Sequence, residues 1–191
     1  MQRYKYSTLE LEVAIVRQYD IRKHIIVPNV SWGANIHECD LLMLSKSGYA
    51  TEVEIKVSLS DLKKDFKKKH KHDSDKIKYL WYCVPDYHKD IALELIPETA
   101  GLLLAQRIGY HTHIYHLRES TARVNCKKWS DEEMMNVMRL GCMRIWNLKS
   151  SMLDNINNIK YLRNQLETNR REDAESAGKL NKAIDKINGN D

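Results

Sequence analysis

The sequence predicts an α/β protein with a mixed central sheet flanked by helices. The chain of 191 residues is 42% hydrophobic, which is enough for a substantial core. Short segments of strand length alternate with segments of helical period along residues 7–116. Helical spacing then continues from residue 130 almost to the end. We therefore expect one domain over residues 1–149, followed by a C-terminal helical extension over 150–191 that frays at its end.

The chain is expected to open with a helix and a strand. Ser7, with Glu10 three positions later, is typical of a capping box, and this helix should end near Tyr19. Residues 24–30 are rich in β-branched side chains and predict a strand that is ended by Pro28 and the residues up to Gly33.

Residues 38–58 predict a β-hairpin, and we expect the other elements to be arranged around it. Residues 41–44 are apolar, residues 51–57 alternate, and a three-residue loop would place Gly48 in the left-handed conformation. In this register Asp40 lies directly opposite Glu54. Glu52, Glu54 and Lys56 share one face of their strand.

The remaining elements follow from period and turn chemistry. Apolar residues at helical spacing predict a helix from Leu59 to His72. We expect strands over 78–84, 101–105 and 111–116, with a helix over 86–95 after Pro85. Ser130 and Glu133 form a second capping box that opens a long helix. A weak heptad-like seam beyond residue 150 would let this helix pair in a homo-oligomer.

The opposed carboxylates of Asp40 and Glu54 indicate a cation site. Like charges at this distance are unfavourable unless something positive lies between them. Carboxylate oxygens suit Mg²⁺, and Lys56 reaches the same space. The alternative is a solvated surface strand with an ordinary Glu54–Lys56 ion pair, and Glu38 is expected to pair with Lys56 across the strands. The pattern alone leaves these alternatives open.

Glu12 lies on the apolar stripe of the first helix, where a carboxylate needs a partner. It either joins the site or pairs with Arg17 or Arg22. His72 is given no ligand role, since His70 and His72 would point apart on a helix.

The positive charge is concentrated beside the hairpin. The net charge is +5, and residues 61–78 contain eight lysines and four aspartates, whereas residues 150–191 contain seven basic and seven acidic side chains. This distribution predicts DNA-backbone contacts, although a solvated face is the alternative. The proposed DNA-binding residues are Lys63, Lys64, Lys67 and Lys68.

Several classes of function are not expected. There is no apolar run of 18 residues and no apolar signal-type segment, so we expect no membrane span and a cytoplasmic protein, in a bacterium or in the host of a phage. No Walker loop or G-x-G-x-x-G motif supports nucleotide-driven chemistry.

Asp40 and the run Glu54-Ile55-Lys56 resemble the PD-(D/E)xK nuclease superfamily, and more closely its MmcB-like DNA-repair branch and related phage proteins. The segments 27–33, 76–85 and 96–101 agree, and the resemblance covers about residues 7–120. Cys39 stands where the family name has proline.

This resemblance implies a restriction-endonuclease-like fold and Mg²⁺-dependent DNA hydrolysis in repair or recombination, with Mn²⁺ able to substitute. Asp40, Glu54 and the Ile55 carbonyl would hold the metal, Lys56 would position the attacking water or stabilise the oxyanion, and Glu12 would be an additional active-site residue. Two other functions remain open: a catalytically silent DNA-binding or assembly protein of nuclease fold, and a structural protein that assembles through its tail helix.

Overall fold

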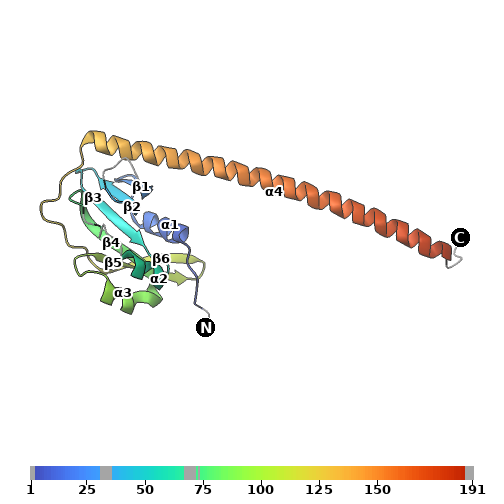
Figure 1. Ribbon diagram of the computed structural model, residues 1–191, viewed down its shortest axis with the longest axis horizontal. Coiled ribbons are helices and arrows are strands. Elements are labelled where there is room, and N and C mark those ends of the chain that lie inside the picture. The colour runs from blue at the N-terminus through green and yellow to red at the C-terminus, as the bar shows by residue number, and fades with distance from the viewer. Residues whose placement is uncertain (1–2, 31–35, 67–71, 73, 188–191) are drawn as a thin grey trace. The chain divides into compact units, whose positions relative to one another are not determined.

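The described residues form a six-stranded mixed sheet (Figure 1). The computed structural model describes residues 3–30, 36–66, 72 and 74–187. The strands lie side by side in chain order. They are β1 (His24–Val30), β2 (Cys39–Ser45), β3 (Ala50–Ile55), β4 (Ile77–Pro85), β5 (Gly101–Ile108) and β6 (His111–Arg118). The β3–β4 and β4–β5 pairs are parallel and the other three are antiparallel, which confirms the predicted mixed sheet.

The described part of the chain also contains four α-helices, and two of them begin at the predicted caps. They are α1 (Thr8–Gln18), α2 (Leu59–Asp65), α3 (Lys89–Leu95) and α4 (Asp131–Ile187), with a 3₁₀ turn, η1 (Asp86–His88), before α3. The Ser7 hydroxyl accepts the Glu10 N–H at 3.2 Å. Ser130 and Glu133 cap one another reciprocally, at 2.8 and 3.2 Å. Both helix starts are therefore confirmed.

The helix predicted from Leu59 to His72 is wrong at its end. In the structure α2 ends at Asp65, and His72 has a left-handed backbone with φ 51°, which does not belong to a helix. The intervening residues 67–71, with Lys67 and Lys68, lie outside the described residues, as do residues 31–33 of the family-like segment.

The two faces of the sheet carry different layers. Leu11 and Ile15 of α1 pack on one face, against a cluster that includes Leu41 and Val53. Leu62 of α2 packs on the other face in a cluster with Tyr82. Because side chains alternate along a strand, Glu52 and Glu54 project on the opposite face from Val53, which is the face of α2.

Strand β1 forms an edge of the sheet, and this position explains why it can contain a proline. Pro28 lies within β1, paired with Leu41 of β2, whereas the sequence suggested that Pro28 ends the strand. Proline is tolerated at an edge because its missing N–H removes no ladder bond there. Val137 and Leu140, near the start of α4, pack in the same cluster as Val27 of β1.

The chain divides into two compact units, Met1–Arg144 and Ile145–Asp191. The second unit consists of the later part of α4, whose apolar side chains, such as Ile156 and Leu166, are exposed. Within the part of the chain that is described, no helix combines the length and apolar character needed to cross a membrane.

Candidate active site

The hairpin of β2 and β3 positions the predicted acidic pair. Gly48 has φ +80°, and Ser45 donates its N–H to the Tyr49 carbonyl at 3.0 Å. The strands pair from Leu44–Ala50 to Leu41–Val53, so the next pair in the same register is Asp40 and Glu54. The predicted register is confirmed.

Asp40 and Glu54 differ in their surroundings. The Glu54 side chain is 2% exposed, whereas that of Asp40 is 30% exposed and lies at the open side of the site. Oδ2 of Asp40 accepts the backbone N–H of Ile55 at 2.7 Å. This bond fixes one oxygen of Asp40 against the end of β3 and leaves the carboxylate accessible to a ligand.

Lys56 lies at the centre of the carboxylates. Its ammonium donates a hydrogen bond to Oε2 of Glu54, and it lies 3.1 Å from Oδ1 of Asp65 and 3.7 Å from Oδ2 of Asp40. Glu38, which we expected to pair with Lys56, is exposed and forms no ion pair with it; that prediction is wrong because three other carboxylates surround the ammonium.

A second set of side chains continues the site on its buried side. The imidazole of His72 lies between two carboxylates, with Nε2 2.7 Å from Oδ2 of Asp65 and Nδ1 2.7 Å from Oε1 of Glu52. His37 places Nε2 2.7 Å from the same Glu52 oxygen. The Tyr82 hydroxyl donates to Oδ2 of Asp65 at 3.1 Å.

These contacts change the protonation of the buried groups. Burial and the nearby Asp40 raise the pKa of Glu54 to about 7, although Lys56 opposes the shift. Burial lowers the pKa of His72, but its hydrogen bonds to Asp65 and Glu52 outweigh burial and raise that pKa to about 10. Burial also lowers the pKa of Lys56, which the surrounding carboxylates, Glu54 first, hold above its usual value. Near neutral pH, Lys56 and His72 are therefore cationic.

The site has spare capacity for a cation. Oε1 of Glu54 and Oε2 of Glu52 are buried and have no hydrogen-bond partner within the described part of the chain. Among the residues that the structure describes, two groups of three side chains bring ligand atoms within 4.8 Å of one another: His37, Glu52 and His72, and Glu54, Asp65 and His72. A divalent ion bound at these two glutamate oxygens would offset the cost of burying them.

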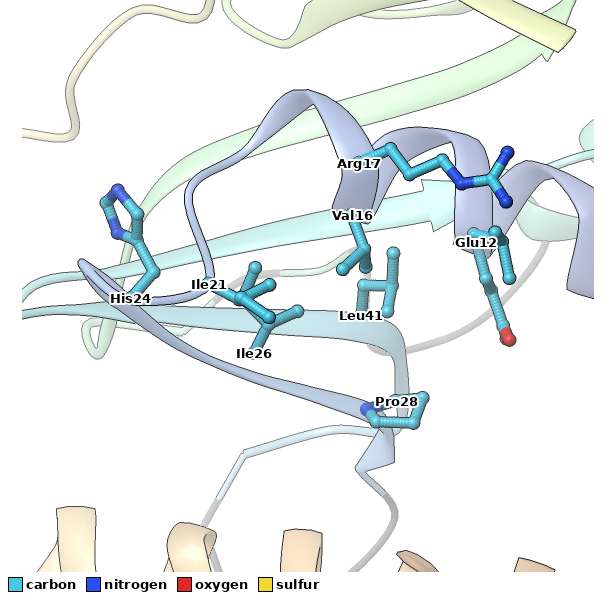
Figure 2. Close-up of a pocket in the computed structure, with 9 residues that line it drawn as sticks. Glu12, Val16, Arg17, Ile21, His24, Ile26, Pro28 and Leu41 are labelled. Atoms are coloured by element: carbon cyan, nitrogen blue, oxygen red, sulfur yellow. The ribbon is translucent and has the colours of Figure 1, made fainter.

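Glu12 lies near Asp40 and beside a pocket of about 450 Å³ between α1 and the first strands. Burial and then the charge of Asp40 raise the pKa of Glu12. Its side chain and that of Arg17 extend in different directions (Figure 2), and among the described residues it has no ion pair. Arg22 pairs with Asp20 at 3.0 Å instead. The expected alternative, a Glu12–Arg pair, is therefore wrong.

Of the four predicted DNA-binding lysines, the structure describes Lys63 and Lys64. Both are exposed on α2, while Leu62 and Asp65 of the same helix are buried. This helix thus presents Lys63 and Lys64 to the solvent and Asp65 to Lys56.

The comparisons with known proteins give a family and a fold. A sequence profile described as "DNA repair protein MmcB-like" matches residues 3–151. The chain belongs to the MmcB-like family of DNA repair proteins. No curated protein sequence matches the chain. A solved structure, the SPO1766 protein of unknown function from Silicibacter pomeroyi, has a TM-score of 0.54 at 16% identity and covers 77% of this chain and 91% of its own. That likeness confirms the α/β fold.

Sequence reasoning on this MmcB-like chain missed Asp65, His72 and the histidine contacts of Glu52. Asp65 carried a usable signal, since it follows Leu62 by three positions and so lies on the buried stripe of α2. The same argument had singled out Glu12. His72 carried no local signal, because its position depends on a left-handed backbone and on partners distant in sequence.

Proposed function

We propose that the chain is a metal-dependent deoxyribonuclease of the PD-(D/E)xK type, which hydrolyses DNA phosphodiester bonds with Mg²⁺ in repair or recombination. The observation that supports this most is the grouping of Asp40, Glu54 and Lys56 at one end of the hairpin, with a buried Glu54 oxygen that has no hydrogen-bond partner within the described residues. Buried carboxylates without a full set of partners are costly unless they bind a cation.

The residues present fit a hard divalent cation. Asp40, Glu54 and the Ile55 carbonyl would hold Mg²⁺, for which Mn²⁺ can substitute, because all three offer oxygen ligands. When bound, such an ion polarises the phosphate, lowers the pKa of an attacking water and offsets charge in the transition state.

Lys56 acts in this proposal as a hydrogen-bond donor. Its raised pKa keeps it protonated, so it cannot serve as a general base near neutral pH. It can orient the attacking water or stabilise the developing negative charge on the phosphate. Glu54 and Asp65 restrict the lysine, which limits the reorganisation required during the reaction.

Glu12 and the lysines of α2 take supporting roles. The half-buried carboxyl of Glu12, close to Asp40, would bind a water molecule of the metal as an outer ligand. Lys63 and Lys64, together with Lys67 and Lys68 of the adjoining segment, would contact the phosphate backbone. For this activity we propose a cytoplasmic location.

A specific observation favours a second candidate, a DNA-binding protein of nuclease fold that does not cleave. Lys56 contacts three carboxylates, and this closed ion network can stabilise the fold without any chemistry. In that case Asp40 and Glu54 would matter for stability and not for turnover.

A cleavage assay on labelled linear, nicked and branched DNA with Mg²⁺, Mn²⁺ or EDTA separates the two candidates. The wild type should cleave with either metal and not with EDTA, whereas Asp40→Asn, Glu54→Gln and Lys56→Met should each lose at least about 100-fold in rate. Glu94→Gln, which changes an exposed carboxylate of α3, is the matched control. DNA binding without metal-dependent cleavage would select the silent protein, and equal cleavage by all variants would indicate a contaminating nuclease.

A further inference from the structure

Two imidazoles and one carboxylate meet at a single point behind the proposed Mg²⁺ ligands. Nε2 of His37 and Nδ1 of His72 each lie 2.7 Å from Oε1 of Glu52, and they lie 3.3 Å from each other. The side chains of Glu52, His72 and His37 are 0%, 6% and 9% exposed. They come from β3, from the residue at position 72 and from the stretch before β2, so the fold brings together three separate parts of the chain.

The hydrogen-bond partners of His72 hold its ring in the way that outer partners hold a metal-binding histidine. Its Nε2 faces Oδ2 of Asp65, which also accepts the Tyr82 hydroxyl. A histidine that donates one ring N–H to a carboxylate presents its other nitrogen to a metal, and such outer partners fix the ring and raise its basicity. Arg123 donates to the His72 carbonyl at 2.6 Å and so holds the backbone of this residue as well.

The other oxygen of Glu52 gives an independent indication of a missing ligand. Oε2 is buried and has no hydrogen-bond partner in the described part of the chain, although the Glu52 side chain is fully enclosed. Oε1 contacts the two imidazoles, whereas Oε2 has no partner among the described residues. The carboxylate can therefore bind an ion through either oxygen or through both.

We propose that His37, Glu52 and His72 bind a divalent transition-metal ion of the Zn²⁺ type, at a site that adjoins the proposed Mg²⁺ site of Asp40 and Glu54, with Nδ1 of His72 3.9 Å from Oε1 of Glu54. Two imidazoles and one carboxylate are a common donor set for Zn²⁺ and leave a fourth position open, whereas Mg²⁺ prefers oxygen ligands alone. Ligand atoms about 2.0–2.1 Å from a tetrahedral ion lie roughly 3.3 Å apart, so the two nitrogens already have the required spacing. To reach the same spacing from both nitrogens, Oε1 of Glu52 has to retreat by about 0.7 Å.

The test measures metal binding without DNA. The full-length protein is stripped with EDTA, dialysed against micromolar Zn²⁺ in the presence of millimolar Mg²⁺, and assayed for bound zinc by elemental analysis. We expect one Zn²⁺ per chain in the wild type and in His111→Gln, which changes an exposed histidine of β6. His37→Gln and Glu52→Gln should weaken Zn²⁺ binding at least 100-fold, and Asp65→Asn 10- to 100-fold.

Asp40→Asn separates this inference from the proposed function. It should abolish cleavage yet retain stoichiometric zinc, since Asp40 is not one of the three ligands. Loss of zinc in Asp40→Asn, retention of zinc in His37→Gln, or no zinc in the wild type would each overturn the inference. Circular dichroism spectra serve as the control that each variant is folded. If Glu52→Gln does not fold, His37→Gln at the margin of the cluster still decides the outcome.

Discussion

The ammonium of Lys56 lies 3.1 Å from Oδ1 of Asp65, so an aspartate of α2 shares this lysine with Glu54 of the neighbouring strand. Asp65 also accepts hydrogen bonds from Tyr82 and His72. The proposed catalytic lysine and the histidine cluster are therefore linked through one carboxylate. A substitution of Lys56 should therefore alter the hydrogen bonding of His72, and a substitution of His72 should alter that of Lys56.

Glu54→Gln should stabilise the metal-free protein at pH 8. The pKa of Glu54 is raised to about 7 in the folded state. The unfolded chain therefore ionises Glu54 more easily, and the free energy of unfolding falls as pH rises from about 4.5 to 7. Above pH 7 the buried, ionised Glu54 lowers the stability of the folded protein by a constant amount. A neutral glutamine removes this cost, which is on the order of 1–3 kcal/mol. Thermal or urea unfolding in EDTA measures the gain.

The same melts with Mg²⁺ provide the second half of this prediction. A ligand stabilises only the state that binds it, so the Mg²⁺-induced rise in Tm should shrink in Glu54→Gln. If the variant loses stability in EDTA while the wild type ignores Mg²⁺, Glu54 is only the ion partner of Lys56 and the nuclease proposal fails.

The stability of the metal-free protein should fall between about pH 6.5 and pH 10. The pKa of His72 is raised to about 10, so its stabilising contribution is complete below the ordinary histidine pKa and is lost as pH rises through 10. The slope from this residue is at most about 1.4 kcal/mol per pH unit. Urea unfolding from pH 7 to 9.5 should give a flatter slope for His72→Gln than for the wild type or His111→Gln. Parallel slopes would mean that His72 is not held as a cation.

Replacing Lys63 and Lys64 by Gln should weaken DNA binding equally for all base sequences. Removing one lysine–phosphate interaction should flatten the slope of log affinity against log salt by about 0.9 for duplex DNA. Fluorescence anisotropy at several salt concentrations gives this slope, and Lys89→Gln on the exposed face of α3 is the control. A slope that stays unchanged in the Lys63 and Lys64 variant would mean that this helix does not contact DNA.

Deleting residues 168–191 should leave the first unit folded and active. This unit ends at Arg144, and the buried residues of α4, Val137 and Leu140, precede the deletion. The change in its unfolding free energy should stay below about 1 kcal/mol, or roughly 2–4 °C in Tm. Light scattering of both proteins shows whether the tail mediates a homo-oligomer. Insoluble truncated protein would show that the tail contributes to the core.

The parts of the site that could be predicted from sequence are those fixed by local rules. The Asp40–Glu54 register depends on a three-residue turn and on strand alternation, and the sequence of residues 40–54 predicts both. Asp65 and His72 depend instead on where α2 ends and on how the chain returns to the sheet. Propensity favoured a longer helix, but tertiary contacts to Glu52 and Asp65 place His72 outside it.

Arg123 donates to the carbonyls of His72 and Ser74, and this contact gives the site an order of assembly during synthesis. The hairpin emerges from the ribosome long before residue 123 does, so its carboxylates exist for a time without the anchor that seats the histidine. A chain arrested before Arg123 would contain both histidines and the carboxylates of the cluster, but it would lack the arginine that holds the His72 backbone. Contacts from residue 123 therefore complete the holding of His72 only after all three proposed ligands, His37, Glu52 and His72, have been synthesised.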